Sequence, residues 1–506
     1  MKRLQFVILL SIPLCWFFFK LLPVYIHPSH CSIPNFIYAE NLHQLKVWTF
    51  DIAPPIPFDD SSNFLYVISL WLLIYFFKLS TLNAVYTIAS ISMVLSVYLL
   101  QRIVDSRFMG INLLLVGLLF MSTQIWGGAL GDEILFQGML WLLAIRSFWK
   151  HRYFWLMIWS SVNIVARPDN LFIILPLIIA SYSDIRELKE REKRDFLRKR
   201  LRKTFLVFIL PTALYFTYRY LYFGKIFPYN WLHYSIKSDQ YWSIFNVEAF
   251  NSLKHYIHFY TLPLFIGVVF YFIKSWKSLN MRYFALAISL LIIPAIYSCT
   301  FSQDNNLAYK NYYPIFLGLI ILSLLFIRDF RSISQGITTA AFVFFFGFKT
   351  AFSYFEKTLQ SYYNNEFYIA NDLSKYNGKA VVFYDNFIQW LTEWEVIYAN
   401  GQHRANGALL DKKAFTSAAA DIIIPDVTFD INSVRQNYYI YTLPKNTRAY
   451  IKEYRPDNSI DLFFYKYAHK KAVKKNDNFI VLVSKSSKNL QGIKDVLESH
   501  GGKKDS

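Results

Sequence analysis

The chain has 506 residues, of which 55% are hydrophobic and 19% aromatic, and this composition argues against an ordinary soluble protein. The formal net charge of +19 would suit a nucleic-acid-binding protein, but the basic residues cluster in short turns between apolar runs. That distribution is typical of cytoplasmic loops in a membrane protein. The composition therefore predicts a polytopic membrane protein that contacts membrane lipids and binds no nucleic acid.

The first apolar run, Leu4–Leu22, follows two basic residues and has no small-residue cleavage site after it. We interpret it as a retained first helix that runs outward. The polar stretch that follows, residues 23–63, is predicted to be an exterior loop. The next run, Phe64–Leu79, is short and ends at Lys78, so it either spans the bilayer or lies in the outer leaflet.

Ten further apolar runs are long enough to be considered as spans: Leu82–Leu100, Ile111–Trp126, Ile134–Ile145, Phe154–Ala166, Leu171–Ala180, Phe205–Leu221, Thr261–Ile273, Phe284–Ser298, Pro314–Ile327 and Ile337–Phe352. If Phe64–Leu79 does not span, all the short basic turns fall on one side, including the basic loop Arg186–Lys203. We therefore predict about eleven transmembrane helices, one interfacial or re-entrant segment, and an N-terminus inside the cell.

Residues 353–506 differ in kind, because they are more polar and mix a helical stretch, Glu356–Tyr376, with short β-rich runs. The β-rich runs are Ala380–Tyr384, Ile422–Ile424, Tyr438–Tyr441, Leu462–Tyr465 and Phe479–Val483. The sequence thus predicts a transmembrane domain over residues 1–352 and an exterior α/β domain over residues 353–506.

Several stretches that this topology places outside the cytoplasm, next to the bilayer, are rich in polar side chains. Removing such side chains from water costs free energy, so their presence there suggests a function. The stretches read FIYAENL at Phe36–Leu42, FDDSSNFLY at Phe58–Tyr66, GDEILF at Gly131–Phe136, ARPDN at Ala166–Asn170 and YFGKIFPYN at Tyr222–Asn230.

In this order they resemble the motifs of bacterial GT-C membrane glycosyltransferases. The arabinofuranosyltransferase-like branch is most similar, with stretches of the type YAENL, VEGYSNPLY, GLETPLF, ARPDG and YGDPLPNT. The resemblance covers roughly residues 1–330 and extends to flagellar motor control proteins of the same architecture. It implies an inner-membrane enzyme that moves a sugar from a polyprenyl-phosphate donor to a glycan, lipid or protein acceptor outside the cytoplasm. Nothing in the sequence calls for a metal or another cofactor.

Transfer from a lipid phosphate needs a base for the acceptor hydroxyl and donors that stabilise the departing phosphate. The carboxylates predicted to be catalytic are Asp59, Asp60 and Glu133. The residues predicted to bind substrate are Glu40, Asp132, Arg167, Asp169, Asn230 and Lys310. Arginine suits the phosphate because its planar fork gives two parallel hydrogen bonds, and a neighbouring aspartate would orient that fork.

Several of these residues have a structural alternative. Asp59 and Asp60 would equally cap the helix that begins near Phe64, and Asp132-Glu133 would cap the next one. Arg167-Pro168-Asp169 also suits a tight turn with an internal ion pair and proline at the first position of the next helix. Lys310 would serve as an interfacial lysine whose amine reaches the headgroups.

One departure from the family pattern bears on activity. The family has an Asp-Asp pair just before its first-loop stretch, where this chain has His30-Cys31. Either another group is the base, or the chain is a non-catalytic member of the fold that acts in envelope or flagellar motor assembly. A transporter is disfavoured, because the polar clusters lie at one interface and the sequence has no repeated halves.

Overall fold

The computed structural model describes residues 33–49, 63–104, 133–186, 191–226, 281–296, 305–329, 365–382, 387–392, 394–398, 420–425, 431–444 and 478–504, with a few single positions between 250 and 273. The chain divides into two compact units. The first comprises Met1–Phe19, Ser62–Ser69 and Val85–Ser353, and the second comprises Lys20–Ser61, Leu70–Ala84 and Tyr354–Ser506.

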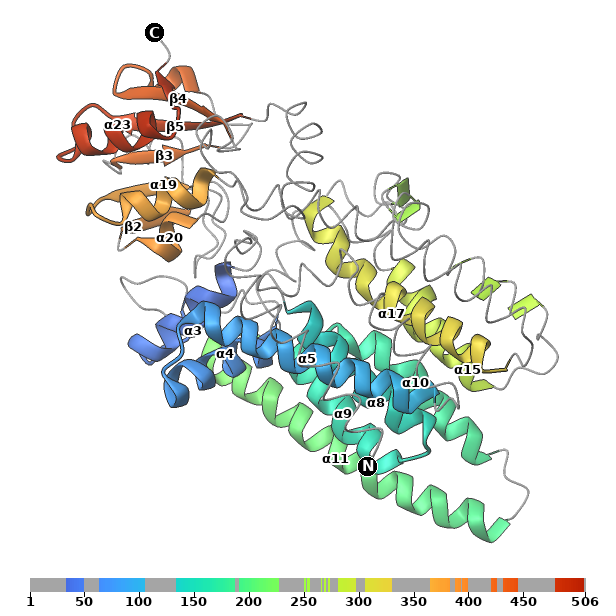
Figure 1. Ribbon diagram of the computed structural model, residues 1–506. Coiled ribbons are helices and arrows are strands. Elements are labelled where there is room, and N and C mark those ends of the chain that lie inside the picture. Colours follow the sequence, from blue (N-terminus) through green and yellow to red (C-terminus); the bar gives the residue numbers. More distant parts are fainter. Residues whose placement is uncertain are drawn as a thin grey trace. The chain divides into compact units, whose positions relative to one another are not determined.

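The described residues of the first unit are helical. This is expected for apolar runs in a bilayer, because lipid offers the backbone N–H and C=O groups no water and a helix pairs them with each other. Among the unit's described residues lie helices α8 (Ile134–Trp149), α9 (Tyr153–Ala166), α10 (Asn170–Arg186), α11 (Arg191–Phe223), α15 (Met281–Ala287) and α17 (Asn305–Asp329) (Figure 1). Helix α9 packs against both α8 and α11. Two more helices, α4 (Phe64–Phe77) and α5 (Thr81–Val104), have residues in both units.

The α15 helix continues as a π-helical turn, η5 (Ile288–Ile292), which packs against α10 and α17 and buries Ser289 and Leu290. The Ser289 hydroxyl donates a hydrogen bond to the Ile173 carbonyl of α10. Gly318 of α17 lies so close to this turn that a Cβ there would be 2.7 Å from the Leu290 Cβ. A glycine is therefore required for α17 to approach η5 at this distance.

Two helical segments in the described part of the chain are long and apolar enough to cross a membrane, Thr81–Leu100 and Lys203–Phe223. The remaining apolar helices are shorter, at Phe64–Phe77, Ile134–Trp149, Tyr153–Ala166, Asn170–Ser183, Met281–Ile296 and Tyr312–Ser323. The predicted helices at these places are confirmed as helices. At 14 residues α4 is about 21 Å long, the same length as α9, so its length does not decide between a span and an interfacial segment.

Two stretches that the sequence places between membrane spans are partly helical. The exterior loop over residues 23–63 contains a helix, α3 (Ile33–Gln44). The basic loop Arg186–Lys203 is helical from Arg191 onward as the start of α11. Arg, Lys, Glu and Leu are strong helix formers, so a highly charged segment can extend a membrane helix into water. The predicted spans Leu4–Leu22, Ile111–Trp126 and Ile337–Phe352, and most of Thr261–Ile273, lie outside the described residues.

The second unit contains a six-stranded mixed sheet in the order β2-β1-β3-β5-β4-β6. Its strands are β1 (Lys379–Val382), β2 (Glu395–Tyr398), β3 (Ile422–Ile424), β4 (Tyr438–Pro444), β5 (Asn478–Ser484) and β6 (Lys503–Lys504). Strands β2, β1 and β3 are parallel, and β5, β4 and β6 pair antiparallel.

Helices α19 (Asn365–Leu373), α20 (Phe387–Leu391) and α23 (Leu490–Ser499) accompany this sheet, with the short helix η6 (Ile431–Val434) before β4 (Figure 1). The predicted strands near Ala380, Ile422, Tyr438 and Phe479 are confirmed, whereas β2 and β6 were not predicted. The run Leu462–Tyr465 lies outside the described residues.

Candidate functional site

Two residues of opposite charge meet at one end of the α8–α9 helix pair. Glu133 directly precedes α8 and its side chain is 1% exposed, while Arg167 directly follows α9. The Arg167 Nη1 lies 3.6 Å from the Glu133 Oε1. They meet because α8 and α9 are neighbours joined by a short turn, so that the start of one helix lies beside the end of the other.

Arg167 is also held by Asp169 in a bidentate contact. The guanidinium donates from Nε to Oδ1 at 3.0 Å and from Nη2 to Oδ2 at 2.6 Å. The backbone turns here, since the Asn170 amide donates to the Arg167 carbonyl at 3.0 Å. The tight turn with an internal ion pair is therefore confirmed, although α10 begins at Asn170, two residues after Pro168. Asp169 occupies the Nε side of the guanidinium, and Nη1 faces Glu133.

The capping alternative is wrong for the Glu133 side chain. Glu133 occupies the N-cap position of α8 but makes no side-chain cap hydrogen bond. At α4 the cap is Asn63, whose Oδ1 accepts from the Tyr66 amide at 3.0 Å. Asn63 therefore fills the capping role that the sequence suggested for Asp59 and Asp60, and both aspartates lie outside the described residues.

A chain of buried amides lies one helical turn along from the Glu133–Arg167 pair. Gln137 and Asn163 are four residues from Glu133 and Arg167 respectively, which places them on the same helix faces. Asn63 donates to the Gln137 Oε1 at 2.9 Å, and Gln137 donates to the Asn163 Oδ1 at 3.2 Å. All three side chains are buried.

Asn170 extends this layer. Its Oδ1 accepts from the Trp141 indole at 3.1 Å, and its Nδ2 donates to the Asn163 carbonyl at 2.8 Å. Gln137, Asn163 and Trp141 were not predicted to be site residues. The available signal was a polar residue within each apolar run, at helical spacing from a predicted site residue.

Two crystal structures of ArnT from Cupriavidus metallidurans are similar to this chain over nearly its whole length. The structure bound to undecaprenyl phosphate has a TM-score of 0.60 and 11% identity and covers 95% of this chain and 98% of that chain. The apo structure has a TM-score of 0.59 and 12% identity with the same coverage. ArnT is a GT-C glycosyltransferase. The chain has a GT-C fold.

No family model and no curated protein matches the sequence. The structural likeness thus confirms the predicted GT-C fold, that of a polytopic membrane protein. It does not extend to the arabinofuranosyltransferase-like branch. Within the GT-C fold, the Glu133–Arg167–Asp169 cluster and the amide layer are contributed by α4, α8, α9, α10 and the residues that flank them.

Glu40 lies in the second unit, where it joins three elements. Its Oε1 accepts hydrogen bonds from the Thr81 hydroxyl at the start of α5 and from the Trp390 indole of α20, the latter at 3.3 Å. Trp390 also contacts Phe36 of α3, with ring centroids 5.1 Å apart. Burial raises the pKa of the Glu40 carboxyl, and the two hydrogen bonds lower it by less. These contacts show a structural role for Glu40, and its predicted role in substrate binding stays a prediction.

The other predicted site residues are not placed. Asp132 and Asn230 lie outside the described residues, and for Lys310 only the position in α17 is described. Within the described ranges, no three His, Cys, Asp or Glu side chains come together as a metal site would require.

Proposed function

We propose that this chain is a glycosyltransferase of the bacterial inner membrane that moves a sugar from a polyprenyl-phosphate donor to a glycan, lipid or protein acceptor outside the cytoplasm. The observation that carries the proposal is the buried Glu133 carboxylate beside the Arg167 guanidinium, in a GT-C fold. The ArnT structure that contains undecaprenyl phosphate supports the lipid class of the donor.

Glu133 is the base in this scheme. Its carboxylate takes the proton of the acceptor hydroxyl as that oxygen forms a bond to the anomeric carbon. The bond between the anomeric carbon and the phosphate oxygen breaks, and the polyprenyl phosphate leaves with the electron pair. Glu133 suits this role because its side chain is 1% exposed and faces a cation.

Arg167 stabilises the departing phosphate. Asp169 fixes the guanidinium plane through the Nε side, and Nη1 and Nη2 carry further N–H groups on the other side. A guanidinium held this way is oriented before substrate binds, so less entropy is lost when it contacts phosphate. Asp59, Asp60 and Asp132 are proposed to lie near this pair, and Glu40, Asn230 and Lys310 to contribute to substrate binding.

The rival proposal is a non-catalytic member of the fold in envelope or flagellar motor assembly, favoured by His30-Cys31 at the place of the family's Asp-Asp pair. The two proposals differ in what they predict for the donor. An enzyme consumes a polyprenyl-phosphate sugar, so its loss should make that lipid accumulate. A non-catalytic member should leave the lipid-linked sugars unchanged.

The test compares the native host with a deletion strain that expresses wild-type protein, Glu133→Gln or Glu395→Gln at equal levels. Lipid extracts are analysed by mass spectrometry for polyprenyl-phosphate sugars. We expect one such species to accumulate in the deletion and with Glu133→Gln, and to return to normal with Glu395→Gln, whose side chain is 60% exposed in β2. Unchanged lipids in the deletion strain would reject the enzyme and favour the assembly role.

A further inference from the structure

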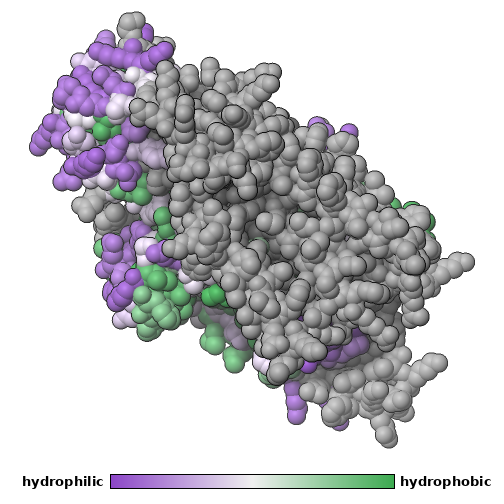
Figure 2. Space-filling view, in the orientation of Figure 1, coloured by the Kyte–Doolittle hydropathy of each residue, from purple (hydrophilic) through white to green (hydrophobic). Residues whose placement is uncertain are grey.

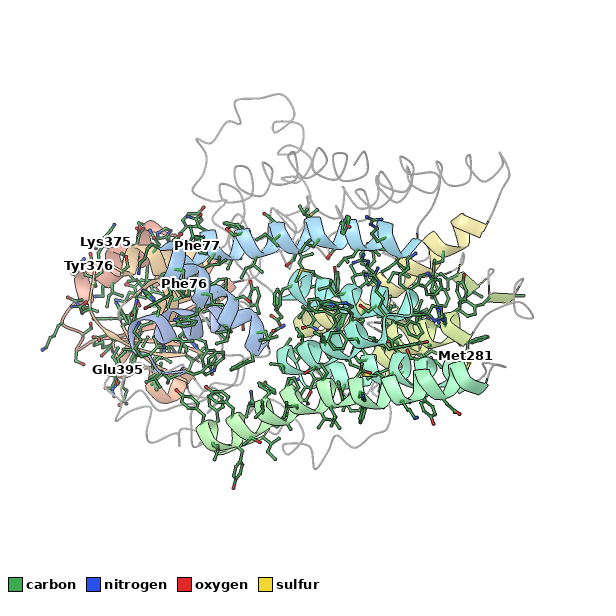
Figure 3. All side chains as sticks on the ribbon, turned by 90° about the horizontal axis from the view of Figure 1, so that it is seen from below. Phe76, Phe77, Met281, Lys375, Tyr376 and Glu395 are labelled. Atoms are coloured by element: carbon green, nitrogen blue, oxygen red, sulfur yellow. The ribbon has the colours of Figure 1, made fainter. Side chains whose placement is uncertain are left out.

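The end of α4 presents an exposed aromatic surface in the second unit. Phe76 is 66% exposed, Phe77 is 70% exposed and Tyr75 is 40% exposed. Figure 3 labels Phe76 and Phe77 at this end of the helix, and Figure 2 shows hydrophobic residues in the region where Figure 1 labels α3 and α4. The helix itself carries no charged residue. Such a surface is expected to contact lipid in a membrane protein.

Two lysines place their ammonium groups on the same aromatic ring. The Nζ atoms of Lys46 and Lys78 each lie 5.3 Å from the centre of the Tyr75 ring. Lys46 follows α3 and Lys78 follows α4, so they come from separate segments. Within the described residues, neither ammonium pairs with a carboxylate. The Lys46 ammonium donates to the His43 carbonyl at 2.5 Å, so its partners are a neutral oxygen and the ring. Two cations therefore share one small region without a carboxylate partner among the described residues.

The backbone at both lysines is left-handed, with φ of 60° at Lys46 and 53° at Lys78. This conformation is unfavourable for a residue other than glycine, but it commonly ends a helix, and each lysine lies just after one. The backbone at the two helix ends thus directs both ammonium groups to the Tyr75 ring.

Two ring nitrogens beside Tyr75 lack a hydrogen-bond partner in the described structure. They are Nδ1 of His43 and Nε1 of Trp71, and both are buried. His43 meets the Tyr75 ring edge-on at 5.9 Å, and Trp71 stacks on it at 5.6 Å. Indole nitrogen is a donor only, so an acceptor is missing at this place.

We propose that His43, Lys46, Trp71, Tyr75 and Lys78 form a binding site for the headgroup phosphate of an anionic phospholipid. A phosphate group would be an anionic partner for the two ammonium groups. Its oxygens would accept hydrogen bonds from the two ring nitrogens. Phe76 and Phe77, next to the site, contact the acyl chains of the same lipid. The lipid thereby holds the end of α4 at the membrane interface, where aromatic rings and lysines are enriched.

The test uses the full-length protein in neutral detergent, with phosphatidylglycerol or phosphatidylcholine added at equal concentration and retained lipid counted by native mass spectrometry. We expect the wild type to retain phosphatidylglycerol preferentially. The double variant Lys46→Gln/Lys78→Gln should lose this preference by about thirtyfold, the effect of removing two surface cations. The control Lys488→Gln/Lys503→Gln removes two exposed lysines elsewhere in the same unit and should retain the wild-type preference.

A second variant tests the contribution of the indole N–H to lipid binding. Trp71→Phe keeps an aromatic ring against Tyr75 but removes the indole N–H, so it should weaken phosphatidylglycerol retention by about twofold or more. The proposal is overturned if the wild type does not distinguish the two lipids, or if the double lysine variant binds like the wild type. A third arm uses undecaprenyl phosphate. If the double variant loses that lipid and keeps phosphatidylglycerol, the site belongs to a polyprenyl phosphate and the phospholipid proposal is wrong.

Discussion

Gln137 donates a hydrogen bond from Nε2 to the Oδ1 of Asn163 at 3.2 Å, one helical turn from the Glu133–Arg167 pair. The direction of this bond is fixed by its surroundings. Asn163 donates from Nδ2 to the carbonyls of Leu140 and Trp159, so its Oδ1 must accept. Gln137 must then present its nitrogen to Asn163 and its oxygen to Asn63. The layer therefore links α4, α8 and α9 in a single hydrogen-bonded arrangement.

This arrangement predicts that Asn163→Asp is strongly destabilising. The substituted carboxylate would face two carbonyl oxygens at 2.7–3.0 Å with no proton to donate. We expect a loss of roughly 1–3 kcal/mol for each buried group left unpaired, seen as a lower melting temperature in detergent. Asn371→Asp, at an exposed position of α19, is the matched control. Equal melting temperatures for both variants would mean that the amide layer adds no stability.

Arg167→Lys tests whether the guanidinium acts on substrate in addition to closing the turn. Lysine keeps the charge but cannot contact Asp169 and a phosphate through a planar fork. We expect folded yield close to wild type and a transfer rate at least about tenfold lower. The rate is followed as clearance of the polyprenyl-phosphate sugar that accumulates in the deletion strain. Full clearance at normal yield would leave Arg167 with its structural role alone.

The sequence predicted helices where long apolar runs leave the backbone no other partner, and strands where β-branched residues cluster, as in Ile422–Ile424. It did not predict α3, because Ile33–Gln44 has no strong amphipathic period and lies in a polar stretch. Strand β6 was missed because two lysines carry no β signal, and only pairing with Tyr441 and Thr442 makes them a strand.

The sequence predicted only part of the candidate site. Charged residues at helix ends, such as Glu133 and Arg167, stand out against apolar runs and were identified from the sequence. Gln137 and Asn163 lie inside those runs, and their importance depends on which helices are neighbours. One sequence does not provide that information, so the amide layer became visible only in the folded chain.

The topology can be tested at two turns. Arg282 donates from Nη1 to the Trp149 carbonyl at 3.2 Å, which brings together two basic turns that the sequence places in the cytoplasm. We expect Arg152→Cys, at one of these turns, to be protected from a membrane-impermeant thiol reagent in intact spheroplasts. Lys225→Cys, after α11, should react. Both are introduced after Cys15, Cys31 and Cys299 are replaced by Ser. Labelling of both or of neither would reject the predicted arrangement.

Glu40 makes the stability of the second unit depend on pH. Burial raises the pKa of its carboxyl above the ordinary value of 4.5, so the folded state favours the protonated form. The stability that Glu40 contributes is therefore fully present below the unfolded-state pKa and is lost as pH rises through the higher folded-state pKa. Glu40→Gln stays neutral and keeps an oxygen that can accept from Thr81 and Trp390.

We therefore expect Glu40→Gln to raise the melting temperature relative to wild type at pH 7.5, and to raise it less or not at all at pH 4.5. The measurement is thermal unfolding of the full-length protein in detergent across this range. Glu395→Gln is the control, because its side chain is 60% exposed and no pH-dependent difference of this sign is expected. A stabilisation by Glu40→Gln that is the same at both pH values would show that ionisation of the buried carboxyl is not its cause.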